Sequence, residues 1–489
     1  MASTASTPLY LAIDQGGHAS RAIVFDSQAG AQAMAEAPVA TLRSGDDRVE
    51  QDADAVAASV REVAERVLAK LGGWAAAVAA GGLATQRSSL VCWDRRTGAA
   101  LSPVLSWQDR RAAKWLAGFA GEAERVHART GLVLSAHYGA SKFRWCLDHL
   151  PGVREALAEG RLALGPMASF LLFRLLAERP HVVDPANASR TLLWDFQTRD
   201  WAADLLDLFG VPRVALPACV PTRHAFGHFE AGAWRIPFRV MTGDQAAALF
   251  AGGAPAPQDA FANIGTGAFV QRIVGDKPVR LPGLLSGVVL EENGRPLYVV
   301  EGTVNGAGVA LETVAGELGL RLADVLRQAP AWLAAATRPP LFLNGVSGLG
   351  SPYWVPDFPS RFVGAGEAPA RIVAVLESIV FLLAVNLEAL RGLSPMLRCV
   401  RLTGGLAALA GLAQRLADVS GLAVVCPEFR EATARGLAYL VAGCPAAWPA
   451  AEARTFAPQP APGLRRRYAS WRCAMEEALP HAPRPTPTP

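Results

Sequence analysis

Two glycine-rich turns, each between apolar strand patterns, are the first parts of this sequence that could do chemistry. In "IDQGGHASRAIVFD" (13–26) the first strand ends at Asp14, and "ANIGTGAFVQRIV" (262–274) repeats the strand–turn–strand pattern. Placing Gly16 on Gly265 gives an offset of 249, close to half of the 489 residues. Backbone N–H groups in such turns can bind phosphate oxygens. The repeat favours two phosphate turns facing one cleft, and chance similarity of two short turns is the alternative.

Four further stretches carry polar groups beyond what a core needs. "LATQRSS" (83–89) and "SWQDRR" (106–111) set polar and aromatic residues at expected strand ends. "MTGDQAAALF" (241–250) places Gly243-Asp244-Gln245 just before a helix, after an apolar run. "LTGGLAALAGLAQRLADVSGLAVVCPEFREATARGLAYLVAG" (402–443) predicts strand, Gly-Gly turn, helix, strand and helix. Paired glycines at a helix start let a flat ring or a phosphate approach the backbone.

The elements that must position these residues alternate between strands and helices. Apolar strand patterns at 9–14, 21–26, 90–94 and 101–107 interleave with "DADAVAASVREVAERVLAKL" (52–71), where four valines follow one helix face: Val56, Val60, Val63 and Val67. This alternation predicts an α/β fold. The apolar run 371–390 contains Glu377, Asn386 and Glu388, so it predicts a buried core helix rather than a membrane span.

The Gly/Pro-rich segment "AGGAPAPQDA" (251–260) predicts a domain junction near the middle of the chain. We expect a first domain over 1–250 with the substrate site and first turn. A second domain over 258–478 would carry the second turn and the nucleotide site. The Pro-rich tail, 479–489, is expected to be disordered.

Composition excludes several classes of function. Hydrophobic residues make up 51%, charged residues 18%, and the net charge of +4 comes without a basic patch, so neither disorder nor nucleic-acid binding is supported. Seven cysteines without a Cys-x-x-Cys pair disfavour disulfides and zinc and fit a reducing cytoplasm. The N-terminus lacks the pattern of a signal peptide. P-loop, complete Rossmann, G-x-S-x-G and H-E-x-x-H motifs are absent from the sequence.

Taken together, the motifs resemble the FGGY carbohydrate kinases, and within that family most closely the glycerol kinases. The matching segments occur in family order over about residues 9–443: "AIDQGGHASRAIVFD", "TQRSSLVCWDRRTG", "VLSWQDRR", "DPANASRTLLWDF", "GDQAAALF", "IGTGAF", "VEGTVNGAG", "SGLGSPYWVPD", "LTGG" and "PEFREATARGLAYL". The resemblance implies two actin-like (ribonuclease H-like) domains flanking a cleft for ATP and a sugar. It also implies ATP and Mg²⁺, with phosphorylation of a hydroxyl of glycerol or a related small polyol or sugar.

The resemblance implies a role for individual residues. Asp244 resembles the general base that accepts the proton of the attacking hydroxyl, and Asp14 and Asp244 resemble the carboxylates that hold magnesium, usually through water. The implied substrate positions are Arg87, Ser88, Trp107, His137, Asp244 and Gln245. The implied ATP and phosphate positions are Gly16, Gly17, His18, Arg21, Gly265, Thr266, Gly267, Gly308, Gly404 and Gly405.

The sequence departs from the glycerol kinase pattern at ligand-contacting positions. Gly17-His18-Ala19 replaces Thr-Thr-Ser in the first turn, where backbone N–H groups can still bind oxygens. Ser88 replaces a Glu that grips substrate hydroxyls, His137 a Tyr, and Leu409 an Asn near the adenine. The alternatives are therefore a non-catalytic or weakly active FGGY-like protein, a kinase for a pentulose or another sugar, or an actin-like ATPase. We expect no nucleic-acid or membrane partner, and a homodimer or homotetramer.

Overall fold

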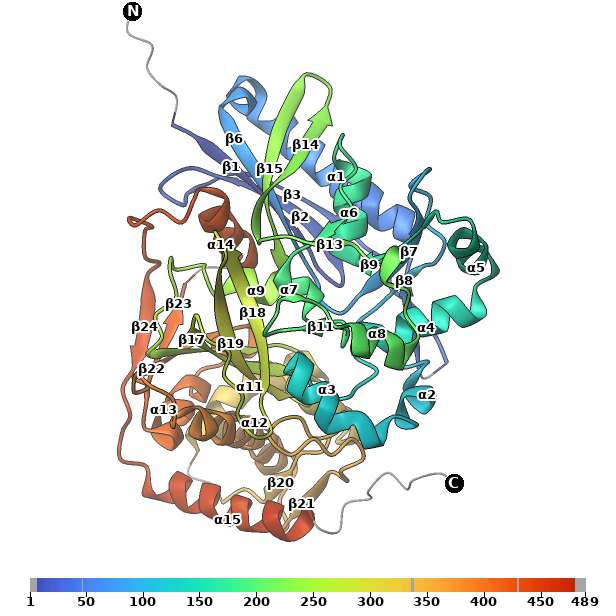
Figure 1. Ribbon diagram of the computed structural model, residues 1–489. Coiled ribbons are helices and arrows are strands. Elements are labelled where there is room, and N and C mark those ends of the chain that lie inside the picture. The colour runs from blue at the N-terminus through green and yellow to red at the C-terminus, as the bar shows by residue number, and fades with distance from the viewer. Residues whose placement is uncertain (1–6, 46, 336–337, 429–430, 480–489) are drawn as a thin grey trace, which may run out of the picture.

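A six-stranded mixed sheet forms the centre of the first half of the chain. The computed structural model describes residues 7–45, 47–335, 338–428 and 431–479 and orders this sheet β14-β15-β6-β1-β2-β3 (Figure 1). β1, β6 and β15 are neighbours and run parallel, which brings their carboxyl ends to one edge. The strands are β1 (Leu9–Gln15), β2 (Ala19–Phe25), β3 (Ala31–Pro38), β6 (Val78–Thr85), β14 (Arg223–Ala231) and β15 (Trp234–Gly243).

The second half repeats this arrangement in a seven-stranded sheet ordered β18-β19-β17-β16-β22-β23-β24. β16 pairs antiparallel with β17, as β1 does with β2, while β22 and β23 continue the sheet parallel to β16. The predicted strand–turn–strand pattern at 262–274 is therefore confirmed. The strands are β16 (Asp259–Ile264), β17 (Ala268–Gly275), β18 (Leu285–Glu292), β19 (Arg295–Val304), β22 (Cys399–Thr403), β23 (Ala423–Pro427) and β24 (Ala453–Phe456).

A smaller five-stranded sheet, ordered β4-β5-β8-β7-β9, carries the loops beside the first sheet's carboxyl edge. Its strands are β4 (Leu42–Ser44), β5 (Arg48–Gln51), β7 (Leu90–Asp94), β8 (Val104–Leu105) and β9 (Leu162–Pro166). Three short ladders pair β10 (Val182–Val183) with β13 (Ala218–Cys219), β11 (Trp194–Asp195) with β12 (Asp200–Trp201), and β20 (Leu341–Leu343) with β21 (Arg361–Val363).

Helix α1 (Ala53–Leu71) covers one face of the first sheet together with α6 (Met167–Leu175). The carboxylate of Asp52 caps α1 by accepting a hydrogen bond from the Ala55 N–H at 2.8 Å. All four valines of the expected face are fully buried, because their spacing directs them to the sheet. The helix predicted over 52–71 is thus confirmed.

The opposite face of the first sheet is covered by α14 (Ala432–Val441), a helix from the second half of the chain. In Figure 1, α14 and the short α9 (Asp244–Ala248) lie between the two large sheets. Small residues permit this contact: a Cβ on Gly82 would lie 2.7 Å from Val441 Cγ2, and one on Gly436 would overlap the Ala247 carbonyl. A single buried cluster therefore joins β1, β2, α9, α14 and the second sheet.

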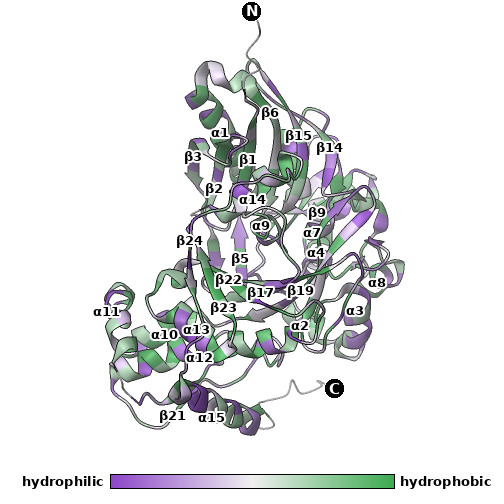
Figure 2. Ribbon diagram, turned by 90° about the vertical axis from the view of Figure 1, so that its left-hand side faces the viewer, coloured by the Kyte–Doolittle hydropathy of each residue, from purple (hydrophilic) through white to green (hydrophobic). Residues whose placement is uncertain are grey.

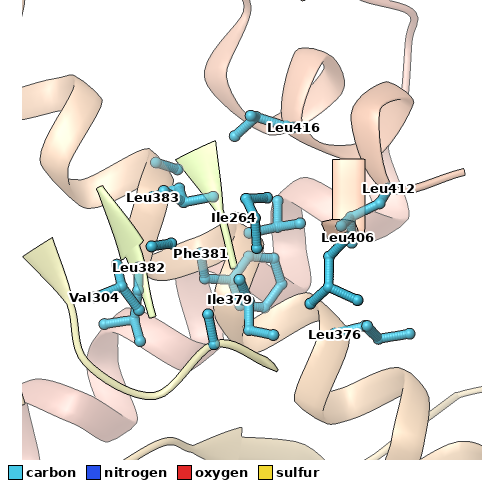
Figure 3. Close-up of a cluster of buried hydrophobic side chains, with 14 of the residues drawn as sticks. Ile264, Val304, Leu376, Ile379, Phe381, Leu382, Leu383, Leu406, Leu412 and Leu416 are labelled. Atoms are coloured by element: carbon cyan, nitrogen blue, oxygen red, sulfur yellow. The ribbon is translucent and has the colours of Figure 1, made fainter. Parts of the chain in front are cut away.

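Helix α12 (Ala368–Leu390) forms the core of the second half (Figure 3). Among the described residues it alone has the length and mean hydropathy, 2.1, of a membrane span, yet 83% of its most apolar window is buried inside the protein. Its polar residues have partners: Glu377 pairs with Arg467 at 2.6 Å, and Asn386 donates to the Leu382 carbonyl at 2.9 Å. The prediction of a buried core helix at 371–390 is confirmed.

The remaining helices lie around these sheets. Figure 2 shows hydrophobic residues along β22 and β23 and hydrophilic stretches on α15 at the periphery. These helices are α2 (Ala113–Ala117), α3 (Ala123–Thr130), α4 (Gly139–His149), α5 (Pro151–Ala158), α7 (Pro185–Ala188), α8 (Ala203–Phe209), α10 (Gly308–Glu317), α11 (Leu322–Ala334), α13 (Leu412–Ser420) and α15 (Pro462–Ala478). The expected disordered tail, 479–489, lies outside the described residues from position 480 onward.

Candidate active site

Three residues that the sequence separates widely meet at the carboxyl edge of the first sheet. Asp14 is the penultimate residue of β1, Arg87 follows β6 by two residues, and Asp244 follows β15 directly as the first residue of α9. The register pairs Asp14 with Ala84 on β6, so the three parallel strands end close together. Parallel strands collect ligand-binding groups at this edge.

The two carboxylates influence each other. Burial, and then the negative charge of Asp244, raise the pKa of Asp14 to about 7. Burial likewise raises the pKa of Asp244, which Arg87 opposes. The buried Asp14 Oδ1 has no hydrogen-bond partner among the described residues, whereas Asp244 Oδ1 accepts from the Gln245 N–H at 2.7 Å. Within the described part of the chain no group of three or more His, Cys, Asp or Glu side chains could hold a metal by itself.

A buried ionic group adjoins Asp244, which we call the Glu301 cluster: Arg87, Arg190, Gln271 and Glu301. Glu301 Oε2 accepts hydrogen bonds from Arg190 at 2.9 Å and Gln271 at 2.7 Å, and Arg87 lies at 3.4 Å. Arg87 also donates to the side chain of Gln245. The two guanidinium groups hold the pKa of the Glu301 carboxyl below its usual range. The sequence did not single out Arg190, Gln271 or Glu301, although Arg190 and Glu301 lie within quoted family motifs.

Three neighbouring rings, those of Trp107, His137 and Tyr138, form another side of the site. The rings of Trp107 and His137 lie 5.6 Å apart between centroids, and the ring of Tyr138 is 4.9 Å from that of His137. Burial, with the nearby Arg110 charge, holds the pKa of His137 well below its usual range, so its imidazole is neutral.

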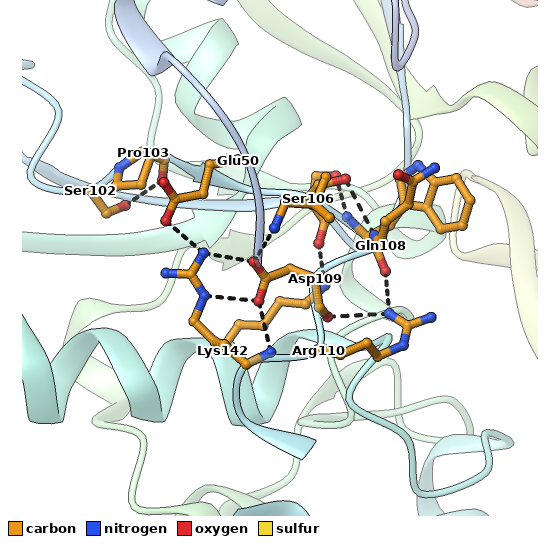
Figure 4. Close-up of polar contacts among 12 residues, drawn as sticks. Glu50, Ser102, Pro103, Ser106, Gln108, Asp109, Arg110 and Lys142 are labelled. Carbon is orange, nitrogen blue, oxygen red and sulfur yellow. Dashed lines mark hydrogen bonds and ion pairs between the residues drawn. The ribbon is translucent and has the colours of Figure 1, made fainter. Parts of the chain in front are cut away.

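One buried ammonium group ties together the loops that carry these residues. Lys142, on α4, donates to the carbonyl of Ser88 at 3.0 Å, of Ser106 at 2.7 Å and of His137 at 2.8 Å. Figure 4 shows Lys142 beside the loop 106–111, which is anchored by the buried Asp109. The Lys142 side chain therefore sets the spacing of the loops that carry Ser88, Trp107 and His137. Lys142 is not among the site residues expected from the sequence.

Ser88 is in the site by position, but its hydroxyl contacts no partner. It adopts φ +62°, in the left-handed region, and its Oγ is buried without a hydrogen-bond partner among the described residues. The neighbouring Ser89 Oγ instead accepts from the Trp107 N–H at 3.0 Å. The backbone carbonyl of Ser88 is thus bound by Lys142, whereas its hydroxyl has no hydrogen-bond partner among the described residues.

The first glycine-rich turn is a tight hairpin held from behind by side chains. The Gly16 N–H donates to the Ala19 carbonyl at 2.9 Å, and the Gly17 carbonyl accepts from Gln51 Nε2 at 2.9 Å. His18 is exposed. Arg21, opposite Asp14 in the hairpin register, lies 3.1 Å from Glu36 and 3.7 Å from Glu431. The turn keeps its backbone near Asp14 without a side-chain hydroxyl at positions 17–19.

The second turn is packed against two other glycines of the expected nucleotide site. The Gly308 N–H donates to the Gly265 carbonyl at 2.9 Å, and a Cβ on Gly308 would lie 2.7 Å from that oxygen. Gly404 has φ +99°, and a Cβ there would lie 2.7 Å from the Ile264 nitrogen. Both positions therefore require glycine. Thr266, Gly404 and Gly405 are exposed, and no atom lies within 4 Å of where a Gly405 Cβ would be.

The carboxyl edges of the two sheets approach one another. β23 ends at Pro427, and Glu431, four positions later, reaches Arg21 on the first sheet. A chain of that length spans at most about 14 Å. Thr433 Oγ1 donates to the Asp244 carbonyl at 3.5 Å, so the start of α14 touches the start of α9. Both turns and Asp244 thus border the same region between the sheets.

Comparisons of the sequence with known families agree with this geometry. The FGGY family of carbohydrate kinases matches through its N-terminal domain at residues 9–251 and its C-terminal domain at 260–443. The chain belongs to this family. A glycerol kinase of Ectopseudomonas mendocina is 36% identical over 445 residues, covering 88% of this chain and 89% of that protein. A glycerol kinase of Methylobacterium nodulans is 35% identical over 99% of this chain and 100% of its own length.

Solved structures of other kinases share the fold of this chain. The glycerol kinase of Plasmodium falciparum, determined with ADP, has a TM-score of 0.85 at 22% identity and covers 97% of this chain and 98% of its own. The xylulose kinase of Rhodospirillum rubrum also has a TM-score of 0.85, at 20% identity, covering 97% and 100%. The expected α/β fold of two actin-like domains is confirmed.

Proposed function

We propose that this carbohydrate kinase transfers the γ-phosphoryl group of ATP to a hydroxyl of glycerol or a related small polyol or sugar. The observation that carries the proposal is the position of Asp244. Its half-buried carboxylate lies at the carboxyl edge of the first sheet, beside Arg87 and Asp14 and next to the first turn. The glycerol kinases among its relatives and the xylulose kinases among structures of like fold support a polyol or ketose substrate.

Asp244 is proposed as the general base. The substrate oxygen would bond to the γ-phosphorus while the bond from that phosphorus to the ADP oxygen breaks, and the hydroxyl proton would pass to the Asp244 carboxylate. A carboxylate whose pKa is raised by burial is a stronger base than one in water. Arg87 partly opposes that rise, so the group remains able to ionise.

Substrate recognition is assigned to the groups around Asp244. Arg87 and Gln245 supply N–H donors for substrate hydroxyls, and the Trp107 ring, next to His137, offers a flat apolar surface for the carbon backbone. The free Ser88 hydroxyl and the neutral His137 imidazole can each donate or accept one hydrogen bond. These donors and acceptors, with the apolar ring of Trp107, suit a substrate that carries several hydroxyls.

The carboxylates of Asp14 and Asp244 fit a magnesium ion accompanying ATP. The unpartnered, buried Asp14 Oδ1 and the mutual repulsion of the two carboxylates are features that a cation would relieve. When bound, magnesium would neutralise phosphate charge. The first turn (Gly16, Gly17, His18), Arg21, the second turn (Gly265, Thr266, Gly267), Gly308, Gly404 and Gly405 are proposed to bind the nucleotide.

A cytoplasmic location and a homodimer or homotetramer complete the proposal. All seven cysteines lie within the described residues and are free thiols, which suits a reducing compartment. Light scattering after size-exclusion chromatography would measure the assembly.

The experiment is a coupled ADP-release assay over glycerol, erythritol, ribitol, xylulose and ribulose with Mg²⁺ATP. We expect turnover with at least one polyol or sugar that disappears in Asp244→Asn while ATP binding persists. Asp54→Asn, a carboxylate in the first turn of α1 paired with Arg174, is the matched control and should keep full activity. ATP binding without turnover on any substrate would instead favour a non-catalytic protein, the reading suggested by a first turn without hydroxyls.

A further inference from the structure

Glu301 is a buried carboxylate that is not among the residues to which the family resemblance assigns a role. Only 2% of the residue is exposed, and one oxygen, Oε2, is approached by three donors: Gln271, Arg190 and Arg87. A buried carboxylate is costly unless it is paired and hydrogen-bonded, as this one is. Glu301 also lies beside Arg87, one of the proposed substrate-binding residues.

The partners of Glu301 come from both halves of the chain. Gln271 on β17 is its direct partner in the strand register with β19, whereas Arg87 and Arg190 follow β6 and α7 of the first half. The hairpin β18–β19 is packed into the first half, since Leu285, Val288 and Tyr298 belong to a buried cluster whose other buried members all come from the first half. Glu301 is therefore a buried acceptor held by donors from both halves of the chain.

The position of Arg87 depends on this acceptor. Its guanidinium reaches both Gln245 and Glu301, and its methylene groups lie over Gly243. The other carboxylate that acts on its charge is that of Asp244. Without Glu301, the guanidinium would be drawn toward Asp244, because a buried cation needs a nearby anion.

We propose that Glu301 is a positioning residue for substrate binding: it holds Arg87 in the orientation that meets the substrate hydroxyls and keeps that guanidinium off the Asp244 carboxylate. The inference rests on the proposed function, because it takes Arg87 as a substrate-binding group. Glu301 acts through Arg87 and itself contacts neither substrate nor nucleotide.

The test is a double-mutant cycle with Glu301→Gln and Arg87→Met. Glu301→Gln keeps the shape of the side chain and an oxygen acceptor for Arg190 while removing the charge. In the wild-type background we expect it to raise KM and the calorimetric Kd for the preferred polyol about 10- to 100-fold, the range for a lost charged hydrogen bond. The KM for ATP should change by less than about twofold.

In the Arg87→Met background, Glu301→Gln should cause no further loss of polyol affinity, because the group it positions is gone. Glu292→Gln is the matched control: Glu292 on β18 pairs with Arg223 on β14, so it also joins the two halves, and polyol affinity should be unchanged. If Glu301→Gln does not fold, Glu301→Asp takes its place, because it keeps the charge and shortens the reach to Arg87.

An equal loss of affinity in both backgrounds would show that Glu301 serves only to join the halves and would overturn the inference. Unchanged polyol affinity in a folded Glu301→Gln protein would overturn it as well. A wild-type protein without polyol-dependent turnover would refute the proposed function itself, an outcome distinct from a working wild type with an indifferent Glu301→Gln.

Discussion

Replacing Gly243 by alanine should displace Arg87 without altering any charge. Gly243 has φ −85° and ψ 152°, a backbone conformation that alanine adopts freely, so no backbone strain arises. The Cβ of the new alanine would, however, lie 2.5 Å from Arg87 Cγ, whereas non-bonded carbon atoms pack at about 3.5 Å. The Arg87 side chain must therefore move by about 1 Å. A misplacement of about 1 Å costs up to about 100-fold in activity.

The assay for Gly243→Ala is steady-state kinetics with the preferred polyol, together with denaturant unfolding. We expect polyol kcat/KM to fall about 10- to 100-fold, the KM for ATP to stay unchanged, and the free energy of unfolding to fall by about 1 to 3 kcal/mol, because the new methyl group overlaps the stem of the hydrogen-bonded Arg87 side chain. Gly252→Ala, where no atom lies within 4 Å of the new Cβ, should behave as wild type. A folded Gly243→Ala enzyme with normal polyol kinetics would show that the position of Arg87 is unimportant.

Two further substitutions test the scaffold of the site. Lys142→Met leaves the carbonyls of Ser88 and His137 without a donor, at about 1 kcal/mol each or more, whereas the Ser106 carbonyl keeps the Asp109 N–H. Denaturant unfolding should therefore show a loss of about 2 kcal/mol and polyol KM should rise; unchanged values would rule out the tie between the loops. Burial raises the pKa of Asp184 to about 7, so the folded state binds more protons than the unfolded state between about pH 4 and 7. The free energy of unfolding should therefore fall as pH rises through that window, and the fall should be smaller in Asp184→Asn, measured at about pH 5 and about pH 8; identical slopes would contradict this assignment.

Local patterns in the sequence were sufficient for the elements that carry the turns. The valine spacing of α1 predicted which face of that helix packs on the sheet, because the periodicity of apolar residues follows the buried face. The polar residues within the apolar run of α12 predicted a buried core helix rather than a membrane span. The two strand–turn–strand hairpins were likewise readable from alternating apolar runs and glycines. The gathering of Asp14, Arg87 and Asp244 at one sheet edge follows once β1, β6 and β15 are known to be parallel neighbours.

The rest of the site depends on contacts between distant segments, which local patterns do not contain. Glu301 faces Gln271 only through the register of β17 and β19, and Arg190 reaches it from a different half of the chain. Lys142 lies on α4, and its importance comes from hydrogen bonds to the carbonyls of three separate loops. Arg190 and Glu301 lie within quoted family segments, "DPANASRTLLWDF" and "VEGTVNGAG", which are the signals that could have identified them.

Because α14 lies on the first sheet although it comes late in the chain, the two halves cannot be separated by cutting between them. A fragment ending near residue 251 would expose the small residues and strands that Leu437 and Val441 cover, and a fragment beginning near 260 would carry an apolar helix with no sheet to rest on. Translation must therefore reach residue 441 before the first sheet is covered on both faces. During synthesis, the first sheet therefore stays exposed on one face until α14 (Ala432–Val441) has left the ribosome.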